Sequence, residues 1–411
     1  MAINTFKSPD WILKKALPVL HAKLNFIGHC HRDYDKEFMQ AGAKIGDTLR
    51  IRLPEQYTVT TGATFVPPPI VQSSTTLTVA TQKHVGMKLT SADLAMTDED
   101  FIERHIVPAM SVLASNIEAD ALNMVYDVYN QVNLAGTTLA PLAFGQARAM
   151  LNKYLAPNDN RRTLLIDSDT SATISDSIKT YFNDSAEISR AFLEGTIGRA
   201  QGFTWAENDL LPTLTTGTRV VADTTSTISA DMVNGAMSIA VANMTTTSSV
   251  AKGEVFTLAG IYAVHPETKA AYSHLQQFVV TSLVSITGGT GTITFTPACY
   301  FSSTSSPALQ NVSTKPLSGI YIQFGAANHG SGVASTNYRQ MVAFHKDAFA
   351  FVTADLPIFD GQPFMARKVM DNISMRIWKF ADGINDSENT RIDILYGYVT
   401  LRPQLACRIT A

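Results

Sequence analysis

The sequence of 411 residues predicts an α+β fold that is built from more than one domain. Three patterns indicate it: alternating apolar residues between Gly46 and Leu89, a helical stripe from Thr97 to about Val132, and a segment rich in threonine, serine, glycine and valine from Thr213 to about Asn337. A single core stops growing at roughly 250 to 300 residues. We therefore expect a mixed domain that is interrupted by an all-β module.

The composition excludes several classes of protein. The formal net charge is −3, whereas a protein that mainly neutralises phosphates needs a clear basic excess. Cys30, Cys299 and Cys407 lie far apart without a C-x-x-C pair, so we expect neither a disulfide framework nor a zinc site. The sequence contains no uninterrupted run of 18 apolar residues, so we expect no membrane-spanning helix. We expect a soluble protein of a reducing compartment.

Residues 1–40 are predicted to form an arm. Apolar residues from Trp11 to Ile27 follow an imperfect helical period, and Pro18 is expected to break or kink the helix. The following run from His29 to Asp33 mixes histidine with charged residues. We interpret it as a solvated turn, because a metal site would need further ligands nearby.

The segment from Gly46 to Leu89 is predicted to form a long β-hairpin. Apolar residues alternate on both legs, and the tip contains Phe65 followed by Pro67, Pro68 and Pro69, which cannot donate to a β-ladder. An isolated two-stranded hairpin is marginal in water, so this arm predicts a partner on which it lies. A loop packed within the chain is the alternative.

A long helix is expected to begin at Thr97, because acidic residues in a first turn complement the free amides there. Its apolar stripe continues to about Val132, which corresponds to a length on the order of 50 Å, with a kink at Pro108. Residues 141–212 are mixed: a helix from Pro141 to Tyr154, a strand from Thr163 to Ile166, and a second helix after Ser168.

Residues 213–337 are predicted to form a small all-β module such as a barrel, in which only Met232 to Ala242 favours a helix. The strands are expected at Glu254–Leu258, Phe278–Ile286, Thr292–Thr296 and Ile320–Phe324, with a hairpin turn at Gly288–Gly291. Mixed α/β character returns with the segment from Met341 to Val352. The chain ends in two strand-like runs, Ile392–Tyr398 and Leu401–Ile409, so we expect one discontinuous domain around the module.

No motif for catalysis or cofactor binding is present. The sequence has no phosphate-binding loop, no G-x-G-x-x-G between a strand and a helix, no G-x-S-x-G and no H-E-x-x-H. His265 precedes Pro266 and is interpreted as a turn residue. We therefore assign no catalytic residue, no cofactor and no metal, although triads can be assembled from distant positions.

The order of arm, hairpin, capped helix and returning α/β domain resembles the major capsid proteins of tailed phages with the Hong Kong 97 fold. The segment from Thr390 to Tyr398, with Leu401 to Ala406 after it, is similar to the closing strands of the podophage subgroup that carries an inserted β-barrel. The run from Lys252 to Gly260 is similar to the core strands of that insertion. The resemblance covers almost the whole chain.

The resemblance implies a division into five parts: an N-terminal arm at 1–40, an extended loop at 41–92, a peripheral domain at 93–140 and 386–411, an axial domain at 141–212 and 338–385, and an inserted β-barrel at 213–337. It also implies pentamers and hexamers in an icosahedral shell around double-stranded DNA. The shell would form as a procapsid on a scaffolding protein and mature by expansion.

The expected partners are further copies of the chain, a separate scaffolding protein, a portal protein and packaged DNA that is contacted weakly, with no membrane. A separate scaffold is expected because some relatives carry a long, charged, cleavable N-terminal segment, whereas Met1 here leads within ten residues into the arm. A virion decoration or attachment protein is the alternative function, and an enzyme comes third. We expect intersubunit contacts at the following residues: Trp11, Lys14, Lys15, Arg50, Arg52, Glu55, Phe65, Pro67, Pro68 and Pro69.

Overall fold

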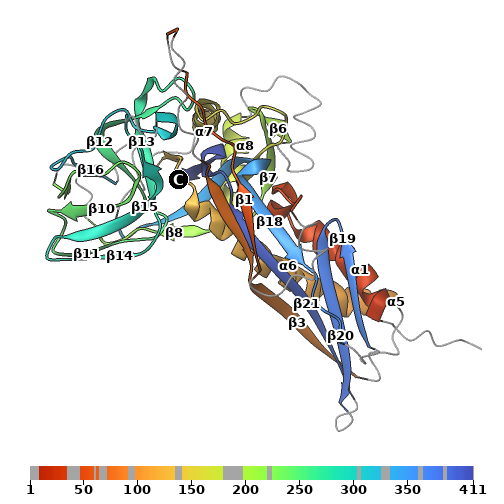
Figure 1. Cartoon of the computed structure of the whole chain (residues 1–411). Helices are drawn as coiled ribbons and strands as arrows, with labels where there is room; N and C mark the ends of the chain where they lie inside the picture. Colours follow the sequence, from red (N-terminus) through yellow and green to blue (C-terminus); the bar gives the residue numbers. More distant parts are fainter. Residues whose placement is uncertain are drawn as a thin grey trace, which may run out of the picture. The chain divides into compact units, whose positions relative to one another are not determined.

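The computed structural model divides the chain into two compact units (Figure 1). Unit 1 comprises Met1–Ile51, Thr75–Leu122 and Phe349–Val399, and unit 2 comprises Arg52–Ser74, Asn123–Ala348 and Thr400–Ala411. The structure describes residues 9–34, 47–59, 62–63, 72–90, 98–134, 141–178, 198–219, 225–302, 307–324, 334–359, 364–382 and 387–410. The expected domain boundaries differ from this division: residues 349–385 lie in the unit of the long helix, and residues 400–411 do not.

The long helix of unit 1 is built from consecutive segments: α5 (Asp98–Phe101), a π-helical turn (Ile102–Ile106) and α6 (Val107–Leu122). A 3₁₀ turn (Asn123–Asp127) follows, so the helical run ends about five residues before the expected Val132. It ends because β4 (Gln131–Asn133) pairs with a strand near the C-terminus. The π turn ends two residues before Pro108, where an α-helix would lose a hydrogen bond.

The sheet of unit 1 has the strand order β18-β21-β20-β19, and β3 also pairs with β21. The strands are β3 (Thr81–Thr90), β18 (Phe349–Ala354), β19 (Met365–Met370), β20 (Ile373–Asp382) and β21 (Ser387–Thr400). Helix α1 (Pro9–Lys23) packs against β19, β20 and α6, and the short α2 (Phe26–His29) follows it. The side chains that α1 buries are Ile12, Leu13, Ala16, Leu17 and Leu20.

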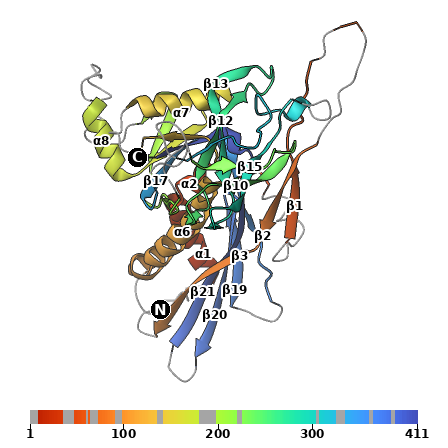
Figure 2. The same ribbon diagram turned by 90° about the vertical axis from the view of Figure 1, so that its left-hand side faces the viewer.

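The expected long hairpin is shorter than predicted. Strand β1 (Asp47–Arg52) pairs with β2 (Ser74–Val79) in a two-stranded ribbon. The rest of the expected return leg is β3, which instead pairs along its whole length with β21 (Figure 2). This pairing supplies ladder hydrogen bonds and a helix-covered face that a free hairpin lacks. Residues 64–71, with Phe65 and the three prolines, lie outside the described residues.

Unit 2 contains a sheet with the order β4-β22-β17-β5-β7-β6, and β8 pairs with β17. The expected helices and strand are confirmed as α7 (Pro141–Lys153), α8 (Ser168–Ile178) and β5 (Arg162–Ile166). The other strands are β6 (Arg199–Ala200), β7 (Phe203–Glu207), β8 (Thr213–Thr215), β17 (Asn337–His345) and β22 (Ala406–Thr410), with 3₁₀ turns at Lys346–Ala348 and Pro403–Leu405.

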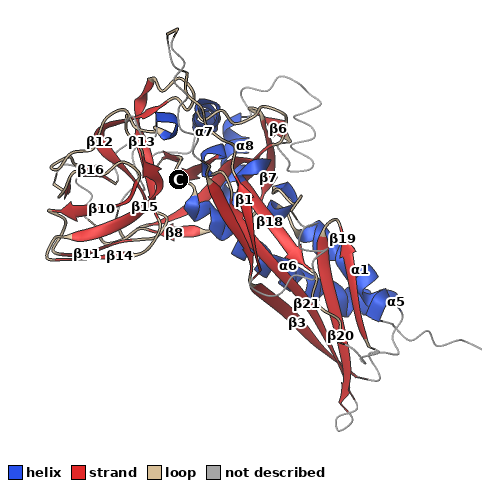
Figure 3. Ribbon diagram, in the orientation of Figure 1, coloured by secondary structure: helices blue, strands red, loops and turns tan. Residues whose placement is uncertain are grey.

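Strands dominate residues 225–324, the β module of unit 2 (Figure 3). Six strands follow the order β16-β12-β13-β15-β10-β9, and β11 pairs with β14 separately. Their bounds are β9 (Thr227–Ile228), β10 (Ala236–Ala242), β11 (Thr247–Val250), β12 (Val255–Val264), β13 (Ala271–Val280), β14 (Val284–Thr287), β15 (Gly291–Cys299) and β16 (Ile322–Gln323), with a 3₁₀ turn at Pro307–Leu309.

Hydrogen bonds connect the two edges of this six-stranded sheet. The Ile228 amide donates to the Ile320 carbonyl over 3.0 Å, and the Ile322 amide donates to the Ser226 carbonyl over 2.9 Å. They support the expected barrel in part. The expected helix at Met232–Ala242 is wrong, because these residues end in β10, which pairs with β15. The turn at Gly288 is confirmed, but β14 pairs with β11 instead of β15.

Gly397 marks a close approach of two strands in unit 1. A Cβ atom at this position would lie 2.2 Å from the Thr78 carbonyl oxygen, which is part of the backbone and cannot move aside easily. We predict that Gly397→Ala lowers the free energy of unfolding by about 1 to 3 kcal/mol. Thermal unfolding measures it. Gly86→Ala is the matched control, since a Cβ there meets nothing within 4 Å, and an equal loss in both variants would contradict the packing argument.

Candidate assembly surfaces

The described part of the N-terminal arm packs on its own unit. Ile12, Leu13 and Leu20 are fully buried against neighbouring elements of unit 1. Trp11 is partly buried, with its ring centroid 6.4 Å from that of Phe101. The apolar face of α1 is therefore already covered within the subunit, and only its polar face remains for other molecules.

Glu118 attaches the end of this arm to the long helix. Its side chain is 1% exposed and accepts hydrogen bonds from the backbone amides of Asn25, over 2.9 Å, and Phe26. These are free amides at the start of α2, where a carboxylate is favoured. A buried carboxylate is costly unless it is hydrogen-bonded, so this contact fixes where α1 ends and α2 begins.

Asp120 attaches the sheet to the same helix. Its Oδ2 atom lies 2.6 Å from Lys83 Nζ on β3 and accepts a hydrogen bond of 2.5 Å from the hydroxyl of Tyr396 on β21. Lys83 Nζ also donates to the Asn116 carbonyl over 3.2 Å. Burial, together with the Asp120 carboxylate, raises the pKa of Tyr396, so this hydroxyl stays protonated. The strand that follows the ribbon is thereby anchored to the helix.

A second charged cluster stabilises the opposite face of the sheet. Asp393 is fully buried and lies 2.8 Å from an Arg376 amino nitrogen and 2.7 Å from Arg391 Nε, and Gln82 Nε2 donates to it over 3.3 Å. The four side chains come from three adjacent strands, β3, β20 and β21. They hold the strand register by ion pairs and hydrogen bonds.

Three of the contact residues predicted for this segment lie among the described residues. Arg50 and Arg52 are exposed, whereas Glu55 is partly buried and accepts hydrogen bonds from the Tyr57 hydroxyl (2.6 Å) and Gln72 Nε2 (3.1 Å). The hydrogen bond to Glu55 raises the pKa of Tyr57. Val59 is 96% exposed and Tyr57 is 62% exposed. These apolar groups, which sequence reasoning did not select, need a covering partner more than the charges do.

Sequence reasoning also missed an aromatic patch on unit 1. Phe359, Phe364 and Phe380 are between 46% and 59% exposed. Phe359 and Phe380 flank the Trp378 ring at centroid distances of 5.9 and 5.6 Å. The alternation along β20 that places Trp378 and Phe380 on one face was the available signal.

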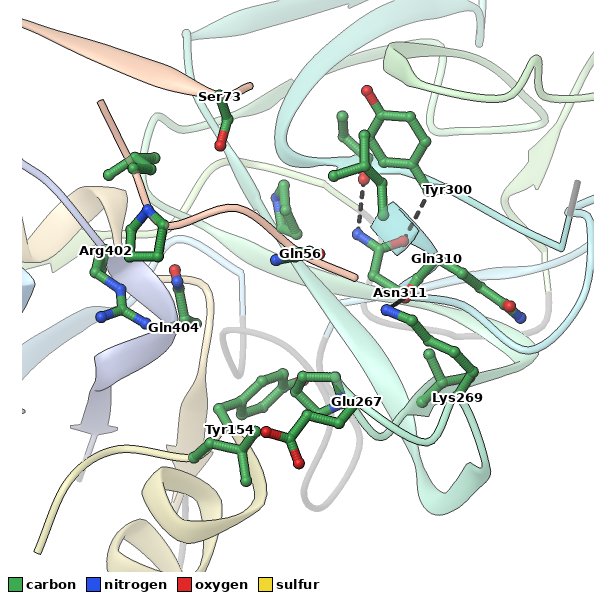
Figure 4. A pocket seen from close by; sticks show the side chains of 18 of the residues that line it. Gln56, Ser73, Tyr154, Glu267, Lys269, Tyr300, Gln310, Asn311, Arg402 and Gln404 are labelled. Atoms are coloured by element: carbon green, nitrogen blue, oxygen red, sulfur yellow. Dashed lines mark hydrogen bonds between the residues drawn. The ribbon is translucent and has the colours of Figure 1, made fainter. Parts of the chain in front are cut away.

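Unit 2 contains a cavity of about 520 Å³ (Figure 4). Its wall is formed by tyrosines, prolines and amide side chains, among them Gln56, Tyr154, Tyr300 and Asn311. Lys269 on this wall already donates to the carbonyls of Ala308 and Gln310. Such a lining has no histidine, cysteine or paired carboxylates for catalysis. In the described part of the chain no group of three or more His, Cys, Asp or Glu could hold a metal ion.

Two histidines that the sequence analysis singled out have local contacts. Nδ1 of His265 accepts hydrogen bonds from the backbone amides of Glu267 and Thr268, which agrees with the interpretation of His265 as a turn residue. His31 Nε2 lies 3.2 Å from its near neighbour Asp33. Among the described residues, no helix is long and apolar enough to cross a membrane.

An ion pair in unit 2 holds the start of the β module. Arg219 and Glu254 are completely buried and form an ion pair, and the Arg219 guanidinium lies 4.8 Å from the Phe324 ring centre. Glu254 also accepts hydrogen bonds from the backbone amides of Gly217 and Ala251, and each of them is 2.7 Å long. The carboxylate thus joins the connection from β8 to the beginning of β12.

The sequence matches the family model described as "P22 coat protein - gene protein 5" over residues 1–408. That is almost the full length of the chain. The chain belongs to the P22 coat protein family. It is a capsid shell protein of a bacteriophage, a structural component of the virion and not an enzyme. The structure confirms the expected α+β class. Membership of this family agrees with the Hong Kong 97-like fold that the sequence resemblance implied.

Several solved structures similar to this coat protein come from phages. One from Mycobacterium phage Che8 is 13% identical, with 94% of this chain and 90% of that chain covered and a TM-score of 0.47. A capsid structure of cyanophage P-SCSP1u is 11% identical, with coverages of 89% and 84% and a TM-score of 0.44. The CUS-3 coat protein I-domain is 20% identical, with coverages of 25% and 95% and a TM-score of 0.20. No curated protein matches this coat protein.

The contact of Glu118 with α2 is open to a direct test in this coat protein. We predict that Glu118→Ala lowers the free energy of unfolding by about 1 to 3 kcal/mol, because it leaves two backbone donors without their acceptor. Glu118→Gln keeps an acceptor oxygen and should lose less. Chemical denaturation measures both variants. Glu103→Ala, an exposed position of the same helix, is the control, and it should match the wild type.

The β module should respond to mild acid through His274. Burial and the neighbouring Lys153 ammonium, 3.5 Å away, lower the pKa of His274 from 6.5 to about 4. The unfolded chain therefore binds a proton between these values when the folded chain does not, and stability falls as the pH drops from 6.5 towards 4. Melting temperatures over this range should decline less in His274→Gln than in the wild type. Equal declines would contradict this role, and His84→Gln, at an exposed site, should decline like the wild type.

Proposed function

We propose that this chain is the major capsid protein that assembles into the pentamers and hexamers of an icosahedral shell around double-stranded phage DNA. Assembly proceeds through a procapsid on a separate scaffolding protein, in the host cytoplasm, and the shell matures by expansion. A portal protein occupies one position in the shell. Family membership supports the shell role, and the following surfaces support the proposed assembly.

The ribbon of β1 and β2 is the observation that carries this proposal. Its two strands pair only with each other in the described part of the chain. The apolar side chains of the ribbon, Ile51, Leu77 and Val79, are buried within the chain, but the segment after β1 exposes Tyr57 and Val59. A neighbouring copy that covers these side chains would complete the ribbon. The ribbon residues Arg50, Arg52 and Glu55, with Phe65, Pro67, Pro68 and Pro69, remain our candidates for intersubunit contacts.

The two units have distinct roles in this proposal. Unit 1, with its long helix and helix-covered sheet, provides the peripheral part and the anchor of the ribbon. Unit 2 provides the axial part, and its β module is a separate folding element with its own aromatic core around Phe256, Phe278 and Phe295. We assign the module a stabilising role, since the buried Glu254 joins it to the rest of unit 2.

Val59 provides the test. We predict that Val59→Asp folds like the wild type but forms no shells, because a charge at this position cannot be buried by a neighbour without a partner. The chain is co-expressed with its scaffolding gene, and particles are counted by electron microscopy. Val233→Asp is the matched control: Val233 is 74% exposed on the β module and should leave assembly intact.

Wild-type chains that stay monomeric across salt and crowding conditions would contradict the proposal, as would shells that form normally from Val59→Asp. The copy number in purified virions separates the shell subunit from the alternative of a decoration or attachment protein. A shell subunit is the most abundant virion protein, whereas an attachment protein is present in few copies.

A further inference from the structure

We propose that the cavity of unit 2 binds the proline run Pro67–Pro69 of a neighbouring copy of the chain. The inference rests on the proposed function, in which copies of the chain assemble, and it names a site that receives one of the expected contact segments. The cavity surrounds Tyr129, Tyr154 and Tyr300, and we call it the tyrosine cavity. Its volume of about 520 Å³ lies within the range of roughly 300 to 1,000 Å³ that is usual for ligand pockets.

The wall of the tyrosine cavity is rich in rings. Tyr129 and Tyr154 lie edge to face with their ring centroids 6.0 Å apart, and both are almost completely buried. Tyr300 belongs to the same wall and is partly exposed. Proline rings complete this surface at three positions: Pro54, Pro266 and Pro297. Grooves that bind proline-rich segments are lined by aromatic side chains in this way.

The same wall has hydrogen-bond donors that are free among the described residues. The side chains of Gln56 and Gln404 donate to no described residue, and Nε of Arg402 is buried without a hydrogen-bond partner there. Figure 4 shows Arg402 and Gln404 on one side of the cavity and Asn311 on the other. Asn311 is already used, because its Oδ1 accepts the Tyr300 amide over 2.9 Å. The side with Arg402 and Gln404 can therefore donate to carbonyl groups of a bound segment.

The proline run has the chemistry that fits this wall. A proline has a carbonyl acceptor but no backbone N–H, so three in succession need donors and no acceptors. Consecutive prolines favour the polyproline II helix, in which three residues extend about 9 Å and all carbonyls stay free. No charged residue occurs in the sequence between Glu55 and Lys83, so burial of this segment leaves no charge without a partner.

Hydrogen bonds at the rim of the tyrosine cavity hold the two ends of the proline-containing segment together. The Leu53 amide donates to the Ser73 carbonyl over 2.9 Å, and Gln72 Nε2 donates to the Glu55 carboxylate over 3.1 Å. Leu53, Glu55 and Ser73 all line the cavity. The two legs are therefore still paired where they pass the cavity.

This pairing favours the run of a neighbouring copy over the chain's own run. Only Ile70 and Val71 separate Pro69 from the paired Gln72, so the chain's own run could reach the cavity only through a reversal at these two residues. Tight turns are formed mainly by Gly, Pro, Asn, Asp and Ser, whereas β-branched residues favour an extended chain. The run of a second copy has no such constraint.

The first test measures binding of a fluorescent peptide with the sequence of residues 63–72 to the full-length, unassembled chain by anisotropy. The receiving chain carries three substitutions that remove its own run: Pro67→Ala, Pro68→Ala and Pro69→Ala. We expect saturable binding, and an affinity at least tenfold lower for a peptide whose three prolines are replaced by alanine. Free donors of the wall would then lose their fixed acceptors.

Two further variants of the receiving chain locate the site. The cavity variant adds Arg402→Ala and Gln404→Ala, and the control variant adds Gln146→Ala and Arg148→Ala at exposed positions of α7. Peptide affinity should fall roughly tenfold or more in the cavity variant, which loses a charged and a neutral donor, and should stay unchanged in the control variant. Circular dichroism checks that both variants fold.

The second test asks whether the run comes from a neighbouring copy in assembled particles. Chains with Val66→Cys are assembled together with chains that carry Gln404→Cys, and the particles are oxidised. Cys30, Cys299 and Cys407 are buried and should not react. We expect a disulfide-linked dimer, which can form only between copies, and no such dimer when Gln146→Cys replaces Gln404→Cys.

Three results would overturn the inference: no binding of the peptide, equal affinity of the proline and alanine peptides, or a disulfide that forms only within single chains carrying both Val66→Cys and Gln404→Cys. The last result would assign the tyrosine cavity to the chain's own run. If particles form without the linked dimer, the inference fails and the proposed function stands. If no particles form while the peptide binds as expected, the proposed assembly fails and the site for the proline run stands.

Discussion

Two carboxylates of the long helix hold unit 1 together. Glu118 accepts hydrogen bonds from backbone amides at the start of α2. Asp120 forms an ion pair with Lys83 and accepts a hydrogen bond from Tyr396, both of the sheet. They lie two residues apart on α6, so they point in different directions around the helix. One helix turn therefore fixes the arm, the strand that follows the ribbon, and the longest strand of the sheet. The position from which the ribbon extends depends on these contacts.

A shell subunit needs rigid units that present defined surfaces, and the chemistry of this chain fits that requirement. Its buried charges act within the structure: Asp393 ties three strands, and Glu254 ties the connection from β8 to the β module. The exposed features are of other kinds: apolar side chains beside the ribbon and aromatic rings beside Trp378. Function in such a protein resides in surfaces that neighbouring molecules complete.

Local patterns in the sequence predicted the elements whose partners are nearby. The helical stripe before Val132 and the strand at Thr163 follow from periodicity, and both are present in the structure. The hairpin was predicted too long because β3 pairs with β21, about 300 residues away, and periodicity carries no information on such a partner. Glu118 looked like an ordinary helix residue in the sequence. Its buried carboxylate accepts a hydrogen bond from the backbone amide of Asn25, which lies 93 residues earlier in the chain. The candidate contact residues stay predictions, because an alternating strand does not show which of its faces a neighbouring subunit covers.

The central claim is that assembly completes the ribbon. Hydrogen exchange of backbone amides, compared between the free chain and the assembled particle, tests it most directly. Amides of β1 and β2 should exchange rapidly in the free chain and slowly in the particle, whereas amides of the central strand β17 should be protected in both. Ribbon amides that exchange equally fast in both states would contradict the account.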